Sequence, residues 1–189
     1  LETGAWTKLD ALAALARRNW KIPTGLEQQL DYARAMALEN LNDAKRSLPI
    51  WAQLAADMSV DPAIRANAMY YLAKASMEKQ DLRRVFAYAQ EALSLLLQTK
   101  GDKDKIKDAI LMTVFATEHS GRWEEALKWA GEYDKYIPDT DPEWPSMRYR
   151  LAEIYRKAGS RAQWRKMMEE IRDKKPDSLY GRMAASALD

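Results

Sequence analysis

A repeated pair of helix-ending residues constrains this sequence more than any other feature. Gly121 and Gly159 lie 38 residues apart, and Pro138 and Pro176 have the same separation. Each glycine stands between two apolar segments with helical periodicity, and the proline ends the second segment because it cannot continue a helix. The spacing therefore predicts a repeated pair of helices joined by a short turn, since self-similarity at a fixed period indicates a repeat architecture.

The composition is that of an all-α protein. Ala, Leu, Met, Glu, Lys, Arg and Gln are abundant, whereas the 189 residues include only seven glycines and seven prolines. The abundant residues are those that lose least on entering a helix. Although 47% of the chain is hydrophobic, no run approaches the ~18 consecutive apolar residues of a membrane span. We therefore predict an all-α fold with no membrane span in this chain.

An earlier repeat has a weaker turn signal. Gln80 takes the place of the turn glycine, 41 residues before Gly121. The second helices of the three repeats are then predicted over residues 82–97, 123–136 and 162–173. Two charged or proline-rich segments between repeats have the composition of loops, and they account for the long spacing.

The first repeat departs most from the pattern. Residues 26–41 are typical of an amphipathic first helix, and we expect the second helix over 48–58. Ser47 is the predicted N-cap of that second helix, because serine side chains accept hydrogen bonds from the free N–H groups of a helix start. Pro49 would then lie in the first turn, where proline is tolerated.

These helix pairs resemble the tetratricopeptide repeat (TPR), a helix–turn–helix unit with a Gly-x-aromatic-x-x-Ala turn and a closing proline. The third repeat reads Gly121-Arg-Trp-Glu-Glu-Ala126 and ends in Pro138. The fourth reads Leu151-Ala-Glu-Ile-Tyr155 ahead of Gly159. The resemblance covers residues 26–176 and is more specific in these two repeats than in the earlier two.

The resemblance implies a right-handed α-solenoid of about four TPR-like helix pairs. Terminal repeats of a solenoid need atypical caps, and we expect capping helices over residues 6–18 and 179–188, with Asp177-Ser178 ahead of the second one. The chain would form a single TPR-like domain over residues 1–189. Its predicted segments are an N-terminal cap (1–25), a degenerate repeat (26–62), three repeats (63–104, 105–142 and 143–176) and a C-terminal cap (177–189).

The sequence offers no catalytic or metal-binding constellation. His119 is the only histidine and there is no cysteine, so the further ligands of a zinc site and the partners of a catalytic histidine are missing. Glu124 and Glu125 suggest paired catalytic carboxylates. However, they fall in a first helical turn, where acids are favoured, and they point about 100° apart. We therefore predict a protein that is not an enzyme and has no cofactor or metal.

Basic residues gather in the fourth repeat without forming a clear nucleic-acid site. Binding of single strands needs a basic stripe with stacking aromatics, and Trp164 is present, but acidic residues interrupt the stripe. The overall net charge is only +2. We interpret the stretch as a solvated face and predict no nucleic-acid partner. The basic residues are Arg156, Lys157, Arg161, Arg165, Lys166 and Arg172.

Most aromatic residues occupy packing positions of the repeat, but three tryptophans do not. Trp6, Trp20 and Trp144 fall in the N-terminal cap or in loops. Trp144 stands between Pro142 and Pro145. It could anchor a partner from a rigid loop or fold back to cover the solenoid, and the sequence leaves both alternatives open.

The resemblance also implies a binding surface. In TPR proteins the first helices line a concave groove that often holds a peptide or a helix. The groove positions map here onto aromatics, Met and charges of both signs, which suits an amphipathic segment because apolar anchors supply area and charges set register. The predicted partner-binding residues are Asn67, Tyr70, Lys74, Met77, Asp108, Leu111, Phe115, Glu118, Tyr149, Glu153 and Arg156.

This lining differs from that of TPR proteins that clamp the C-terminal carboxylate of chaperones. Tyr70 and Lys74 stand where Lys and Asn are expected, and Met112 replaces the next Asn. We predict a non-enzymatic scaffold that binds a protein or peptide partner within a larger assembly. The alternative is a repeat domain of a larger secretion or envelope polypeptide that self-associates through its end caps.

The C-terminal segment, residues 175–188, places Pro-Asp-Ser ahead of an aromatic and an alanine-rich helix. In this it resembles TPR-like proteins of the bacterial envelope, which implies a location in the periplasm or in a membrane-associated assembly; the alternative is the cytoplasm. The start, Leu1-Glu-Thr-Gly-Ala-Trp6, is typical of a fragment, and a signal peptide or an anchor before Leu1 is left open.

Overall fold

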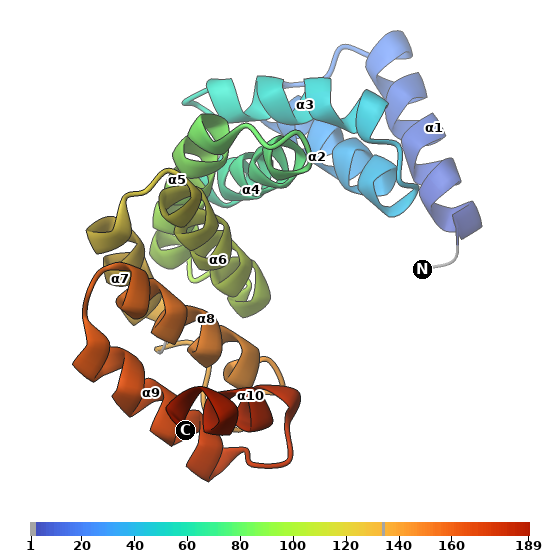
Figure 1. The fold of residues 1–189 in the computed structure, drawn as a ribbon. Coiled ribbons are helices and arrows are strands. Elements are labelled where there is room, and N and C mark those ends of the chain that lie inside the picture. The colour runs from blue at the N-terminus through green and yellow to red at the C-terminus, as the bar shows by residue number, and fades with distance from the viewer. Residues whose placement is uncertain (1–2, 134) are drawn as a thin grey trace. The chain divides into compact units, whose positions relative to one another are not determined.

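A computed structural model describes residues 3–133 and 135–189, and there the chain forms ten helices and no strand (Figure 1). The prediction of an all-α fold is confirmed. Residues 1–2, in the predicted N-terminal cap segment, and residue 134, in the predicted helix 123–136, lie outside this description. The helices are α1 (Thr3–Asn19), α2 (Thr24–Asn40), α3 (Ala44–Ala56), α4 (Pro62–Glu78), α5 (Leu82–Gln98), α6 (Lys103–His119), α7 (Trp123–Tyr133), α8 (Trp144–Lys157), α9 (Arg161–Lys174) and α10 (Leu179–Leu188).

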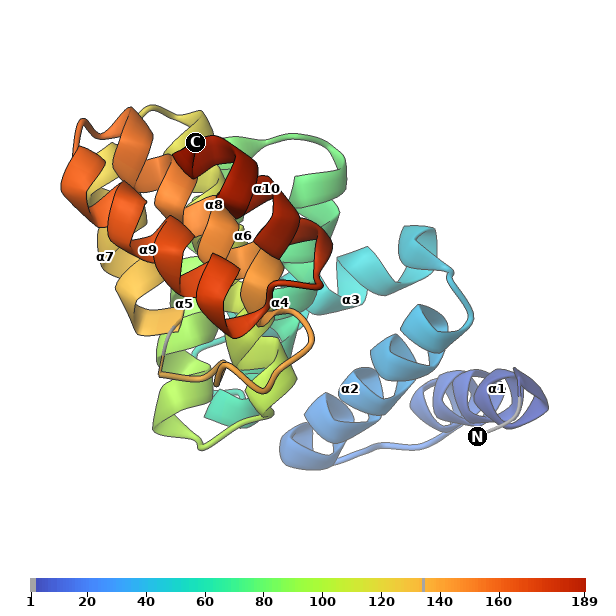
Figure 2. The same cartoon turned by 60° about the horizontal axis from the view of Figure 1, so that its bottom comes forward.

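The helices pack into two compact units, an N-terminal unit (Leu1–Ala109) and a C-terminal unit (Ile110–Asp189), whose boundary falls within α6. In the N-terminal unit each helix from α1 to α5 packs against the next, and in the C-terminal unit α7 to α10 do the same (Figure 2). Such neighbour-to-neighbour packing is how solenoid repeats bury their apolar faces. The single domain over residues 1–189 stays a prediction.

The first helix of every repeat ends in the same backbone turn. The second residue past the helix has positive φ in Asn42 (56°), Gln80 (56°), Gly121 (70°) and Gly159 (82°). At α6 the N–H groups of Gly121 and of the following Arg122 donate to carbonyls of the last helical turn, at 3.0 and 2.9 Å. This Schellman arrangement satisfies carbonyls that the helix leaves free. The four positions are separated by 38, 41 and 38 residues, so Asn42 supplies the turn in the degenerate first repeat.

The second helix of the first repeat begins earlier than predicted. α3 starts at Ala44, and its N-cap is Asp43, whose carboxylate accepts a hydrogen bond from the Arg46 N–H at 3.3 Å. Ser47 is buried inside the helix and donates to the Glu39 carboxylate at 2.5 Å. The prediction of Ser47 as N-cap is therefore wrong, because Asp43 directly follows the positive-φ turn and reaches the free N–H groups first.

The core of the N-terminal unit is centred on Trp51, which is fully buried. Its indole stacks on Tyr71 with ring centroids 4.9 Å apart and meets Tyr32 edge to face at 5.9 Å. Its Nε1–H donates to the Glu39 carboxylate at 2.9 Å, so the only polar atom of this large side chain is satisfied. Trp51 thereby joins α2, α3 and α4.

The side chain of Trp144 packs within the C-terminal unit instead of projecting from a loop. It is the first residue of α8 and only 5% exposed. Lys174 Nζ and Arg148 Cζ lie 5.5 and 5.9 Å from its ring centroid. Of the two alternatives that the sequence leaves open, the structure shows the packing one.

The terminal helices are held by polar contacts as well as by packing. On α1 the buried Asp10 accepts hydrogen bonds from Arg34, at 2.8 Å, and from Arg46. At the other end, the Ser178 hydroxyl accepts from the Gly181 N–H at 2.9 Å and caps α10, as predicted. None of the described helices is long and apolar enough to cross a membrane.

Candidate functional site

The predicted partner-binding residues all lie on three first helices, α4, α6 and α8. The structure divides them between the two units, and each unit therefore carries its own candidate surface. The N-terminal unit holds Asn67, Tyr70, Lys74, Met77 and Asp108, and the C-terminal unit holds Leu111, Phe115, Glu118, Tyr149, Glu153 and Arg156.

Tyr70 and Asp108 join α4 to α6. Tyr70 is only 5% exposed, and its hydroxyl donates to Asp108 Oδ2 at 2.6 Å. Burial raises the pKa of Tyr70, and the hydrogen bond to the charged Asp108 raises it further, so the phenol keeps its proton. Tyr70 is therefore engaged within the protein and offers a partner little free surface, whereas Asp108 is exposed.

Two lysines lie over the rings of Tyr70 and Tyr71. Lys74 Nζ is 5.8 and 5.9 Å from the two ring centroids, and Lys105 Nζ is 5.6 and 5.3 Å from them. These distances suit cation–π attraction. Lys105 also donates a hydrogen bond to the Asn67 side chain. Two ammonium groups therefore gather over one aromatic pair, which we call the lysine–tyrosine cluster.

The lysine–tyrosine cluster has an unbalanced charge. Among the described residues, neither Lys74 nor Lys105 has a carboxylate within ion-pair distance. Burial lowers the pKa of Lys105; the nearby charge of Asp102 opposes this shift, and the charge of Lys74 acts in the same direction as burial. An anionic group of a partner would offset this repulsion and the loss of hydration, so the cluster favours a carboxylate or another anion.

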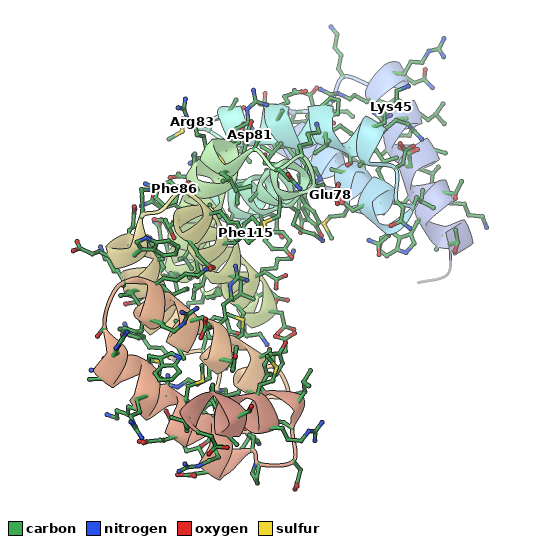
Figure 3. All side chains as sticks on the ribbon, in the orientation of Figure 1. Lys45, Glu78, Asp81, Arg83, Phe86 and Phe115 are labelled. Carbon is green, nitrogen blue, oxygen red and sulfur yellow. The ribbon has the colours of Figure 1, made fainter. Side chains whose placement is uncertain are left out.

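A cavity of about 420 Å³ opens beside Tyr71 and Lys74. Its size falls in the range of about 300–1,000 Å³ that is typical of ligand pockets. Its walls are formed by the last turns of α2 and α4 and by the start of α3. Glu78, labelled in Figure 3, is one of the lining residues of α4. The lining residues are Glu39, Asn40, Asn42, Ala44, Leu48, Tyr71, Lys74, Ala75 and Glu78.

Tyr71 and Lys105 belong to this surface but are not among the predicted residues. Tyr71 follows Asn67 by four positions and precedes Lys74 by three, so helical spacing places it on their face. Lys105 lies one helical turn before Asp108. Both could have been found by extending the predicted faces by one turn. The stacking of Tyr71 on Trp51 has no such local signal.

On the C-terminal unit, Glu118 is already neutralised. Its carboxylate pairs with Lys157 Nζ at 2.9 Å and with Arg150 Nη2 at 3.2 Å. Burial acts to raise the pKa of Glu118, but the two cations hold it below its ordinary value. The ring centroid of Phe115 (labelled in Figure 3) is 4.0 Å from that of His119 and 5.5 Å from Arg150 Cζ. These contacts join α6 to α8.

The predicted residues of α8 are likewise paired. Glu153 accepts hydrogen bonds from Arg156 Nη2 at 2.8 Å and from Trp164 Nε1 at 3.3 Å. Tyr149 packs against Tyr180 of α10 with ring centroids 5.6 Å apart. The charges predicted to set the register of a partner are therefore largely satisfied within this unit, in contrast to Lys74 and Lys105.

His119, Glu124 and Glu125, which the sequence suggested as possible catalytic residues, do not form a common site. His119 is exposed at the end of α6, with Nδ1 2.9 Å from the Phe115 carbonyl oxygen. Glu125 pairs with Arg122 at 2.9 Å, while Glu124 is exposed. Across residues 3–133 and 135–189, no three His, Cys, Asp or Glu side chains are grouped as metal ligands would be.

The basic stretch of the fourth repeat is interleaved with acids on the same helix. Arg165 pairs with Glu169 at 3.2 Å, and Arg172 pairs with Asp173 at 2.7 Å. All four side chains are well exposed. This pattern is that of a solvated helix face.

Repeated helix pairs with a common turn define an α-solenoid of the TPR type, and solved structures share this fold. No family model and no curated protein matches the sequence. YrrB, described as a TPR protein with an unusual peptide-binding site, matches with a TM-score of 0.65 and 16% identity over 97% of this chain and 86% of that one.

Two further structures match in the same way. TPR-like repeats of a putative kinesin light chain from Podosopora anserina match with a TM-score of 0.65 and 13% identity, over 93% of this chain and 88% of theirs. BtubC from P. vanneervenii matches with a TM-score of 0.61 and 13% identity, over 98% and 77%. Identities this low establish the fold alone, and the chain therefore has a TPR-like fold.

Proposed function

We propose that this chain is a non-enzymatic TPR scaffold that binds a peptide or helix of a partner protein on its first helices. The lysine–tyrosine cluster carries the proposal: two cations that have no carboxylate partner among the described residues lie over an aromatic pair, beside a cavity of about 420 Å³. An acidic side chain of the partner would sit at Lys74 and Lys105. The fold it shares with YrrB, whose description names a peptide-binding site, supports this role.

The other predicted residues are proposed as further partner contacts, each on the unit to which it belongs. Met77 follows Lys74 by three positions on α4, and Leu111 and Phe115 are half-buried on α6. Such side chains would supply apolar area, while charged neighbours set the register of the partner. In the C-terminal unit the existing ion pairs of Glu118 and Glu153 would have to be shared with the partner.

The test is capture of partners from native cells with the intact gene product. Lys74→Glu should abolish capture, because it replaces a cation of the cluster with a repelling carboxylate. Lys103→Glu, an exposed lysine at the start of α6, makes the same charge change outside the cluster and should capture normally. Equal capture by both variants, with unchanged helical circular dichroism, would rule out the cluster as the binding surface.

A second candidate function is self-association through the end caps. Leu12 and Leu15 on α1 are 63% and 52% exposed, and Leu179 on α10 is 59% exposed. Isolated exposed apolar residues are common, but these lie on the terminal helices, where a further copy could add to the stack. Light scattering at rising concentration decides: a mass that grows for the native chain but not for Leu12→Glu supports self-association, and a constant monomer mass contradicts it.

We also propose a place in a bacterial envelope assembly, in the periplasm or at a membrane. This proposal rests on the resemblance of the C-terminal segment alone. Fractionation of native cells tests it, since an envelope protein should be released with the periplasm or sediment with membranes. Recovery only with the cytoplasm would contradict it.

A further inference from the structure

A second cavity, of about 370 Å³, lies in the N-terminal unit on the side of the second helices α3 and α5. None of the predicted partner-binding residues lines it. Its volume is again in the range of ligand pockets, about 300–1,000 Å³. We call it the α3–α5 groove. Its lining residues are Lys45, Leu48, Pro49, Ala52, Leu72, Ala75, Ser76, Lys79, Asp81, Arg84 and Tyr88.

Small side chains leave this groove open. Pro49 and Ala52 of α3 and Ala75 of α4 stand where larger residues would fill the space between the helices. Leu72 and Tyr88 contribute apolar surface, and both are only half-buried. The groove can therefore remove one or two apolar side chains of a ligand from water, which is the main source of affinity in such pockets.

The rim of the groove is basic. Lys45, Lys79 and Arg84 line it, and Asp81 is the only acidic residue among them (Figure 3 labels Lys45 and Asp81). Asp81 is already used: it caps α5 by accepting from the Arg84 N–H at 3.2 Å, and it pairs with Arg84 Nε at 3.4 Å. Within the described part of the chain, Lys45 and Lys79 have no carboxylate at ion-pair distance.

We propose that the α3–α5 groove docks a short acidic peptide segment of a partner protein, with a leucine or phenylalanine in the groove and acidic side chains at Lys45 and Lys79. The charge of the rim selects for acidic flanks, and the apolar walls select for the central anchor. A flat anionic bilayer would meet the two lysines but could not fill the groove. This site differs from the lysine–tyrosine cluster of the proposed function, because Lys74 and Lys105 do not line it, although its cavity shares Leu48 and Ala75 with the cavity beside Tyr71.

The test uses the full chain and a synthetic peptide in which Leu-Phe is flanked on each side by two glutamates. Nuclear magnetic resonance titration should shift amide signals of residues 45–52 and 79–88. The double variant Lys45→Glu/Lys79→Glu should bind about tenfold more weakly, since two exposed ion pairs are replaced by repulsion. The control Lys103→Glu/Lys166→Glu changes net charge equally at exposed sites and should bind normally.

A second variant tests the groove itself. Ala52 is exposed, so Ala52→Trp should fold and should block the groove and abolish peptide binding. Retained binding by this variant, or equal loss in both double variants, would overturn the proposal. So would binding only to vesicles containing phosphatidylglycerol. Loss with Lys74→Glu but not with Lys45→Glu/Lys79→Glu would place the peptide on the first-helix surface, overturning this site and leaving the proposed function intact.

Discussion

Asn42 and Gln80 adopt the left-handed backbone conformation that glycine adopts at Gly121 and Gly159. A side chain makes this conformation costly, because Cβ approaches the following carbonyl oxygen, and asparagine tolerates it better than glutamine. The same turn is thus formed by residues whose conformational free-energy cost at positive φ differs. Its position in the repeat is set by the Schellman hydrogen bonds, and the residue type adjusts only the local stability.

Replacing Gln80 by glycine should therefore stabilise the protein. Gln80→Gly is expected to raise the free energy of unfolding by up to about 1 kcal/mol, as measured by urea denaturation. The control is Lys79→Gly, because Lys79 has a φ of −87° and gains nothing from glycine. A lower stability of Gln80→Gly would show that its side chain makes contacts that outweigh the backbone cost.

The reverse change at Gly159 should destabilise. A Cβ at Gly159 would meet no atom within 4 Å, so Gly159→Ala isolates the conformational cost of positive φ, about 1 kcal/mol. Urea denaturation measures this cost as well. Unchanged stability would mean that the turn relaxes to negative φ.

Glu118 links stability to pH. Its two cation partners hold its folded pKa below the ordinary value of 4.5, so it contributes stability that is present above about pH 4.5 and is lost as the pH falls through the folded pKa. Glu118→Gln should lose less stability than the native chain between neutral pH and acidic pH. Urea denaturation across that range measures it, with the exposed Glu124→Gln as control. Parallel pH curves for all three proteins would contradict the expectation.

At the scale of elements, the packing of α10 against the preceding chain requires glycine, which has no side chain, at position 181. Gly181 is buried, and a Cβ built there would lie 1.9 Å from the Lys175 carbonyl oxygen. The chain before α10 and the first turn of the helix therefore approach more closely than any other residue would allow. Ser178 caps the same turn. Residues 175–181 therefore determine both where α10 begins and how closely it packs against the preceding chain.

Gly181→Ala should displace α10. The expected loss is about 1–3 kcal/mol, the usual cost of overpacking. The matched control is Gly131→Ala, since Gly131 is also helical but has no atom within 4 Å of an added Cβ. It should gain up to about 1 kcal/mol from the better helix propensity of alanine. Thermal unfolding followed by circular dichroism compares them, and equal effects of both variants would contradict the close approach.

At the scale of the whole molecule, stability should be distributed between the two units. Each unit has its own buried residues, for example Leu54 in the N-terminal unit and Ile154 in the C-terminal unit. In an array of repeats each element contacts mainly its neighbours, so loss of packing in one place is felt mainly nearby.

Hydrogen exchange can test this distribution. Leu54→Ala should cost about 2–5 kcal/mol and raise amide exchange mainly in Leu1–Ala109, whereas Ile154→Ala should raise it mainly in Ile110–Asp189. Mass spectrometry of peptides resolves the two regions. Equal acceleration in both units by either variant would show that the chain unfolds as a single cooperative body.

Local interactions made much of this fold predictable. Helix formers predicted the all-α class, and Gly121, Gly159 and the prolines predicted the turns. Ser178 predicted the start of α10, since the hydroxyl and the N–H that it accepts from are three residues apart. In each case the deciding contact lies within one or two helical turns along the chain, where spacing alone specifies it.

Only the tertiary structure decided which side chains remain free to bind. Tyr70 and Asp108 have the helical spacing of surface residues, yet they bond to each other 38 residues apart in the chain. Lys74 and Lys105 have no carboxylate partner in the part of the chain that the structure describes, and Trp144 is buried. The sequence by itself determined the all-α class, the order of the helix pairs and the turns at Gln80, Gly121 and Gly159. The packing of one helix against the next decided burial and ion pairing, because both depend on neighbours that are distant in the chain.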